Sequence, residues 1–152
     1  MKTLIIVLMI SGLVFAQAAN LKSLNGFSVI VLGNDDALSR TRSEIKTEAE
    51  LLLRSYKIEV ESEITVWPAL SITVATYRVE NNNSNPSYCY SVLVDFYRKV
   101  KVEDVDRADF CSVWESPSMV GICPVKDFDK VVIENVKKHI KMFINDYLSV
   151  NK

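Results

Sequence analysis

The sequence predicts an α+β fold, a mainly antiparallel sheet of about five strands with two amphipathic helices on one face. Two patterns predict it. Short runs of β-branched and aromatic residues, separated by turn residues, recur along the chain. Two longer stretches instead repeat apolar residues every three or four positions, as helices packed on a sheet do. The expected order is strand, helix, four strands, helix.

The first strand and the first helix are expected in the first third of the chain. Residues 27–32 form a β-branched run bounded by Gly26 and Gly33, which is typical of a buried strand. Asp35 or Asp36 then caps a helix that ends at about residue 56. The apolar stripe of this helix contains Leu38, Ile45, Ala49, Leu52 and Tyr56.

Strands are expected after this helix. Residues 58–64 alternate apolar and polar side chains, and Trp67-Pro68 interrupts or borders that strand. The next two strands are residues 70–79 and 88–102, joined by a polar loop, and residues 110–114 and 119–123 form a closing hairpin around residues 115–118.

The last helix is long and begins after Asp127, which caps it. Apolar residues follow one of its faces at helical spacing, so we expect it to pack on the sheet. That face contains Phe128, Val132, Val136, Ile140, Phe143 and Tyr147.

The first eighteen residues have the pattern of a secretory signal peptide. Lys2 precedes an apolar run that ends in Ala16-Gln17-Ala18, small residues in the spacing of a cleavage site. The run is shorter than the ~20 apolar residues of a membrane span, so we expect no transmembrane anchor. The sequence therefore predicts a signal peptide over 1–18, a single α+β domain over 19–152, and a periplasmic or extracellular protein.

Composition argues against several classes of partner. The net charge is −1. The sequence contains no run of lysine and arginine interleaved with aromatic residues, so we expect no binding to nucleic acid. With one histidine and no C-x-x-C pair, the sequence predicts no metal site, and no motif indicates a cofactor. The oligomeric state stays open.

The three cysteines suggest one disulfide. Cys111 and Cys123 lie six residues on either side of Pro117, so a hairpin turning there would place them opposite each other. An exported protein meets an oxidising compartment, and we predict that this pair is bonded. The alternative is two buried, reduced thiols. Cys89 is left over.

Three residues are candidates for catalysis, and the sequence assigns a catalytic role to none. A thiol at Cys89 needs a nearby base, but the only histidine, His139, lies among lysines of the last helix. We therefore expect an inert Cys89 and an exposed His139. Asp95 lies within an apolar run, and we expect it to face water on the uncovered side of the sheet.

Aromatic residues on the predicted strands suggest a binding surface. If helices cover one face of the sheet, rings on the other face would form an exposed aromatic surface for a protein or a small apolar ligand. The candidates are Tyr77, Tyr88, Tyr90, Tyr97 and Trp114. The alternative is that these amphipathic rings only cover the second face.

Two segments carry a family resemblance. Residues 48–54, with Tyr56-Lys57-Ile58 after them, form one, and residues 142–151, MFINDYLSVN, form the other. Together they resemble a family of small exported bacterial proteins without an assigned activity. The resemblance implies a bacterial, exported α+β protein and supplies no catalytic residue.

The leading hypothesis is a non-enzymatic binding or accessory domain, associated with the bacterial envelope. It depends on the signal peptide, the lack of a catalytic motif and the aromatic strands. The rival is a small secreted thiol or carboxylate enzyme that uses Cys89 or Asp95. A secreted inhibitor or effector is the third hypothesis.

Overall fold

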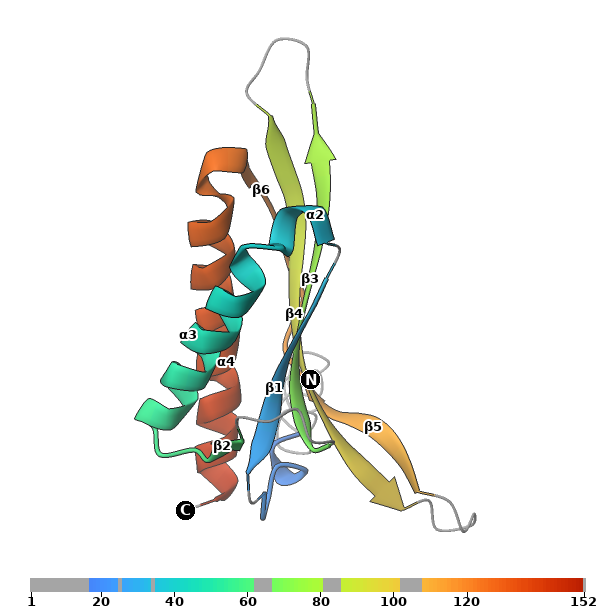
Figure 1. The fold of residues 1–152 in the computed structure, drawn as a ribbon. Helices are drawn as coiled ribbons and strands as arrows, with labels where there is room; N and C mark the ends of the chain where they lie inside the picture. The colour runs from blue at the N-terminus through green and yellow to red at the C-terminus, as the bar shows by residue number, and fades with distance from the viewer. Residues whose placement is uncertain are drawn as a thin grey trace, which may run out of the picture.

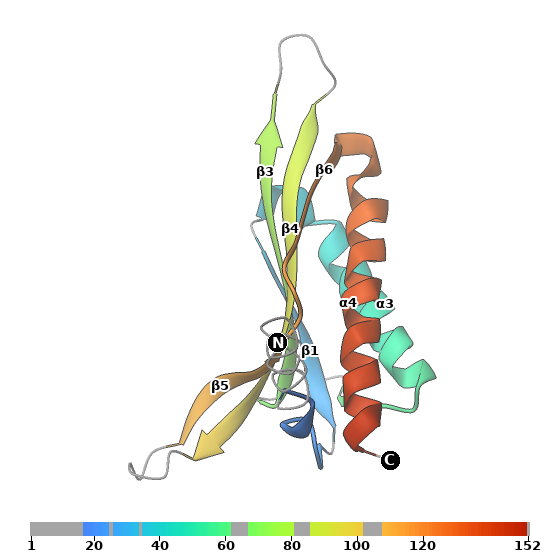
Figure 2. The ribbon, with the colours of Figure 1, turned by 180° about the vertical axis from the view of Figure 1, so that it is seen from behind.

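The computed structural model describes residues 17–24, 26–33, 35–61, 67–80, 86–101 and 108–151. These residues form a six-stranded sheet with helices on one side, which confirms the α+β class (Figures 1 and 2). The strands are β1 (Phe27–Gly33), β2 (Val60–Glu61), β3 (Ala69–Val79), β4 (Ser87–Lys101), β5 (Ala108–Glu115) and β6 (Met119–Pro124). The helices are α2 (Asp35–Leu38), α3 (Thr41–Ser55), the 3-10 turn η1 (Val125–Asp127) and α4 (Phe128–Val150).

The sheet is mainly antiparallel, as predicted, but it also contains parallel pairs that the sequence did not predict. Its order is β2-β1-β3-β4-β5, and β1 pairs in parallel with both β2 and β3. A helix between two strands returns the chain to the end where the first strand began, and α3 does this between β1 and β2. The β3–β4 pair is antiparallel and runs over the whole length of β3.

The predicted closing hairpin is wrong. β5 and β6 do not pair with each other but follow one another along the same edge of β4, β5 beside residues 95–101 and β6 beside residues 87–92. Ser116 joins them. Its N–H donates to the carbonyl of Val94 at 2.8 Å, and its hydroxyl accepts the N–H of Val94 at 3.0 Å. The side chain thus completes the ladder at the joint, and the chain continues without reversing.

The predicted disulfide is wrong for the same reason. Cys111 lies opposite Arg98 and Cys123 lies opposite Tyr88, ten positions apart on β4. At a rise of ~3.3 Å per residue this separation is about 33 Å, far beyond the reach of a disulfide. Both thiols are free.

The predicted first helix is divided in two. α2 and α3 are separated by Ser39 and Arg40. The buried stripe of α3 is Thr41, Ile45, Ala49 and Leu53. Leu53 therefore takes the place expected for Leu52, and Tyr56 is exposed just beyond the helix.

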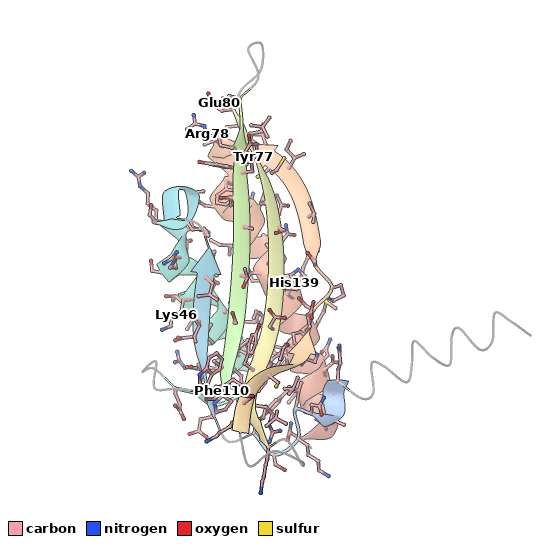
Figure 3. The ribbon with its side chains drawn as sticks, turned by 90° about the vertical axis from the view of Figure 1, so that its right-hand side faces the viewer. Lys46, Tyr77, Arg78, Glu80, Phe110 and His139 are labelled. Atoms are coloured by element: carbon pink, nitrogen blue, oxygen red, sulfur yellow. The ribbon has the colours of Figure 1, made fainter. Side chains whose placement is uncertain are left out.

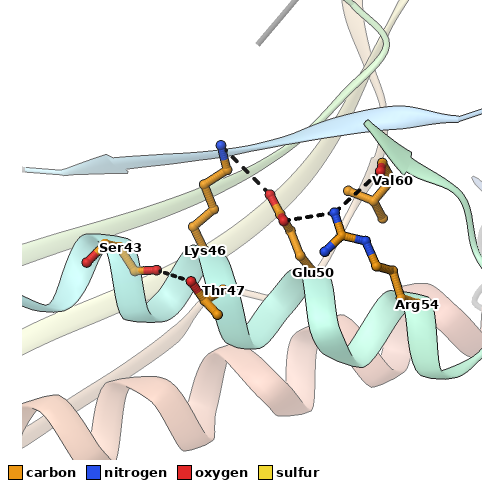
Figure 4. Close-up of polar contacts among 6 residues, drawn as sticks. All are labelled: Ser43, Lys46, Thr47, Glu50, Arg54 and Val60. Carbon is orange, nitrogen blue, oxygen red and sulfur yellow. Dashed lines mark hydrogen bonds and ion pairs between the residues drawn. The ribbon is translucent and has the colours of Figure 1, made fainter. Parts of the chain in front are cut away.

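A polar stripe on α3 fixes that helix to the sheet edge (Figure 4). The carboxylate of Glu50 forms ion pairs with Lys46 at 3.8 Å and with Arg54 at 3.0 Å, which lie one helical turn before and after it. Arg54 also donates to the carbonyl of Val60 in β2 at 3.5 Å. Each i,i+4 pair is worth only ~0.3–0.5 kcal/mol, so the stripe orients the short strand more than it stabilises the fold.

The core lies between the sheet and the two long helices, and Phe143 of α4 is at its centre. Its ring centroid lies 5.5 Å from that of Phe96, 5.6 Å from that of Phe27 and 5.2 Å from that of Trp114. These three rings come from β4, β1 and β5. Phe143 therefore connects α4 to three strands at once.

The end of α4 holds the segment that enters β1. The amide of Asn151 donates to the carbonyl of Leu21 and accepts the N–H of Ser23, both at 2.8 Å. The hydroxyl of Tyr147 donates to the carbonyl of Leu24 at 3.2 Å. Leu21 is completely buried. The two ends of the described chain are thus joined by side chains of the last two helical turns.

Replacement of Phe143 by alanine should lower the free energy of unfolding by about 3–5 kcal/mol, because it leaves a cavity among three packed rings. Urea denaturation followed by circular dichroism measures this change. Met142→Ala is the matched control, since Met142 is 41% exposed and its truncation should cost less than about 1 kcal/mol. Equal losses in the two variants would contradict the central position of Phe143.

Candidate binding face

One face of the sheet is left uncovered by α3 and α4, which both lie on the opposite side (Figure 1). We call it the open face. Successive side chains of a strand point to opposite faces. On β4, Val92, Val94 and Phe96 are fully buried toward the helices, so the odd-numbered residues of β4 belong to the open face. The register then assigns Thr73 of β3 and Val120 of β6 to the same face, as partners of Leu93 and Ser91.

Four of the large apolar side chains exposed on the open face form a group that we call the apolar patch. They are Leu32 of β1, Tyr77 of β3, and Val120 and Ile122 of β6. Between 49% and 76% of each residue's surface is exposed to solvent. Leu93, Ala75 and Cys89 occupy open-face positions between them. A large apolar area is therefore in contact with water.

An aromatic cluster of Trp67, Tyr97 and Phe110 lies at the other end of the open face. The ring centroid of Trp67 is 4.8 Å from that of Phe110 and 5.6 Å from that of Tyr97. A register shift between Phe96 and Tyr97 marks a β-bulge. Beyond it the β4–β5 ladder bends away from the helices (Figure 1). Figure 3 shows Phe110 and Tyr77 near opposite ends of the face.

Of the five residues that the sequence grouped as a binding surface, Tyr77 and Tyr97 lie on the open face. Tyr88, Tyr90 and Trp114 point toward the helices, because they occupy the other set of alternating positions. The hydroxyl of Tyr90 accepts the Asn135 amide at 2.8 Å, and the ring of Tyr88 packs at 4.8 Å from that of Phe128. The five residues therefore do not form one surface.

The indole of Trp114 donates to Asp146 of α4 at 2.8 Å. Trp114 is almost completely buried, so this bond connects sheet and helix and offers no ring to a ligand.

Three residues of the apolar patch, Leu32, Val120 and Ile122, are absent from the surface that the sequence predicted. For Val120 and Ile122, the alternation with Gly121 gave a usable signal. A Cβ at Gly121 would lie only 2.5 Å from the hydroxyl oxygen of Tyr90, so Gly121 faces the helix side and its two neighbours face the open side. The prediction considered aromatic residues only, and these three are aliphatic.

Asp95 lies on the open face, as expected, but is only 5% exposed and does not face water. Its neighbours across the ladder are Ser71 of β3 and Glu115 of β5. Burial raises the pKa of Asp95, and the Glu115 carboxylate raises it further. Burial also raises the pKa of Tyr97, with smaller contributions from both carboxylates. Burial thus disfavours the charged forms of both side chains.

His139 is only 2% exposed, which contradicts the expectation of an exposed side chain. Within the part of the chain that the structure describes, neither nitrogen of its imidazole has a hydrogen-bond partner. Burial lowers its pKa, and Lys138 lowers it further. His139 belongs to α4, whereas Cys89 lies at an open-face position, so the sheet separates the two residues. The structure therefore gives no support to a thiol–imidazole pair.

The described residues contain no group of three or more His, Cys, Asp or Glu side chains placed to hold a metal ion. Of the acidic loop between β4 and β5, Asp104 and Asp106 lie outside the described ranges. None of the helices in these ranges has an apolar stretch long enough to cross a membrane.

A cavity of about 560 Å³ lies on the helix side, between the β5–β6 joint and α4. Its walls are Gln17, Trp114, Glu115, Ser116, Pro117, Met142, Asn145 and Asp146. Trp114 and Asp146 bond to each other, and Ser116 bonds to β4. These polar groups are thus engaged within the fold. Gln17 belongs to the predicted signal peptide.

No protein-family model and no curated protein sequence matches this chain. The resemblance to small exported bacterial proteins therefore stays a prediction.

The stability of the protein should fall in mild acid because of His139. The unfolded imidazole takes up a proton near pH 6.5 and the folded one only at lower pH, so acidification below about pH 6.5 favours unfolding. One proton contributes at most about 1.4 kcal/mol per pH unit. Urea denaturation from about pH 7.5 to about pH 5.5 should show this slope in the wild type, and His139→Leu should remove it. An unchanged slope in His139→Leu would assign the effect to other groups.

Asp95→Asn should stabilise the protein at neutral pH. A carboxyl whose folded pKa is raised favours the fold when protonated and opposes it when charged, so the gain is largest above the raised pKa. It should shrink toward pH ~4, where Asp95 is itself neutral. Thermal denaturation at both pH values measures this. The control Glu115→Gln should act in the same direction but less, because Glu115 is exposed. Destabilisation by Asp95→Asn at neutral pH would show that the charged form is needed.

Proposed function

We propose that this protein is an exported, non-enzymatic binding domain that docks a protein partner on the open face. One observation carries the proposal, namely the exposure of all four side chains of the apolar patch on one face of one sheet. Apolar patches of more than a few hundred Å² are rare on monomeric soluble proteins and mark interaction sites.

The distribution of charge supports the same proposal. The described open-face positions of β1, β3 and β6 carry no Lys, Arg, Asp or Glu. The charged open-face residues of the other strands are Glu61, Asp95, Lys99, Lys101 and Glu115, all toward the bent end. Depletion of charge together with exposed aromatic and aliphatic side chains is typical of the centre of a protein–protein interface.

The start of the fold supports export. Asn20 donates to the carbonyl of Val113 at 3.1 Å, and its own carbonyl accepts Arg98 at 2.9 Å. Cleavage after Ala18 would remove the backbone hydrogen bonds from Asn20 to Gln17 and from Leu21 to Ala18. It would leave the bonds of Asn20 with Val113 and Arg98, and those of Asn151 with Leu21 and Ser23. We propose a periplasmic or secreted location on this ground and on the pattern of the first eighteen residues.

Cross-linked capture from the envelope fraction of the native host, read by mass spectrometry, tests the docking role. Ile122→Lys places a charge in the apolar patch, so it should reduce recovery of the partner at least ~10-fold, which corresponds to about 1.4 kcal/mol. Leu51→Lys is the matched control, because Leu51 is 55% exposed on α3, outside the open face. It should recover the partner as the wild type does.

Equal recovery by wild type and Ile122→Lys would contradict the proposal. Urea denaturation of both variants checks that each is folded. Fractionation of the same cells into cytoplasm, periplasm and medium tests export, since a protein confined to the cytoplasm with its first eighteen residues intact would contradict that part.

A further inference from the structure

We infer that the partner on the open face is a second copy of this chain, and that two copies pack sheet against sheet around a two-fold axis. The inference rests on the proposed docking role of the open face and adds the identity of the occupant. Three properties of the face carry it: its size, its charge and the difference between its two ends.

The size of the face is enough for a small dimer interface. β1 flanks β3 only along residues 69–74 and β6 flanks β4 only along residues 87–92, so three of these four strands lie side by side at most levels, ~14 Å across at a spacing of ~4.8 Å. The eleven residues of β3 rise ~3.3 Å each, which gives a length of about 36 Å. The product is about 500 Å² per copy, or about 1,000 Å² for the pair, which is the lower limit of a specific interface.

The charge of the face permits contact with itself. Under a two-fold axis every open-face residue meets the same surface, so a cluster of one sign would be repelled by its own copy. The apolar patch contains no charged side chain. Asp95 at its border is only 5% exposed, and burial raises its pKa. A face of this kind is compatible with its own copy without a complementary partner.

The two ends of the face differ in a way that suits an antiparallel arrangement. Tyr77 lies at one end, and the cluster of Trp67, Tyr97 and Phe110 lies at the other. A two-fold axis through the middle brings Tyr77 of each copy toward the aromatic cluster of the second copy. The bent β4–β5 ladder, which turns toward the open side, would then enclose the projecting end of the second copy's β3–β4 pair (Figure 1).

Cys89 supplies an internal probe of this contact. It lies between Tyr77 and Ile122 across the ladder, within the apolar patch, and it is partly exposed. Cys111 is exposed on β5, at a position alternate to the open-face residue Phe110. A dimer formed through the open face should therefore shield Cys89 from alkylation and leave Cys111 reactive.

Sedimentation velocity of the purified protein, with residues 1–18 removed, tests the inference across a concentration series. The wild type and Leu51→Lys should sediment as dimers at the upper concentrations. Ile122→Lys and Val120→Lys should remain monomers there, with dimerisation weakened at least ~10-fold. In parallel, N-ethylmaleimide should modify Cys89 more slowly in the wild type than in Val120→Lys. The rate at which it modifies Cys111 should be the same in both proteins.

A wild type that stays monomeric at every concentration would overturn the inference, and so would dimers that Ile122→Lys and Val120→Lys leave intact. A failure of the dimer can be distinguished from a failure of the proposed docking role. A monomeric wild type whose captured partner, a different protein, is lost in Ile122→Lys would overturn the dimer alone. Capture insensitive to Ile122→Lys, together with a monomeric wild type, would overturn both.

Discussion

The register of β4 is the constraint on which the rest of the structure depends. One edge of this strand pairs with β3 over residues 87–97, and the other edge carries β5 and β6 in succession. Its alternate side chains supply both the core under the helices and the open face. Because the period of a strand is two, a slip of one residue would exchange these two sets and expose Phe96 to water. Core and binding face are therefore determined together.

Local patterns in the sequence were enough for the fold class and for the approximate bounds of β1, β3, β4 and α4, because periods of two and 3.6 residues are properties of short segments. The pairing of the strands was not accessible in this way. The parallel partners of β1 depend on a helical crossover, and the β5–β6 joint depends on one serine that bonds to Val94. Near Pro117 the sequence is compatible both with a hairpin and with a chain that continues along the same edge. The hairpin was predicted, and the disulfide was wrongly predicted from it.

The candidate site was predicted in part, since Tyr77 and Tyr97 lie on the open face. The type of a ring does not indicate which face of a strand carries it, so Tyr88 and Tyr90 were grouped with them wrongly. The helical spacing of His139 would have predicted its burial better than its neighbours did. It lies one turn from Asn135 and one turn from Phe143, on the buried side of α4. Its neighbouring lysines suggested exposure, but a helix alternates buried and exposed residues within a single turn.

The bonds from Asn151 and Tyr147 to residues 21–24 have a consequence for the way the chain reaches its folded state. The segment that leads into β1 is anchored by residues 123 to 130 positions further along the chain. Contacts at such a sequence separation require the closure of a long loop, which slows their formation. If the chain is exported, as we propose, these anchors would form only after residues 147–151 had also crossed the membrane.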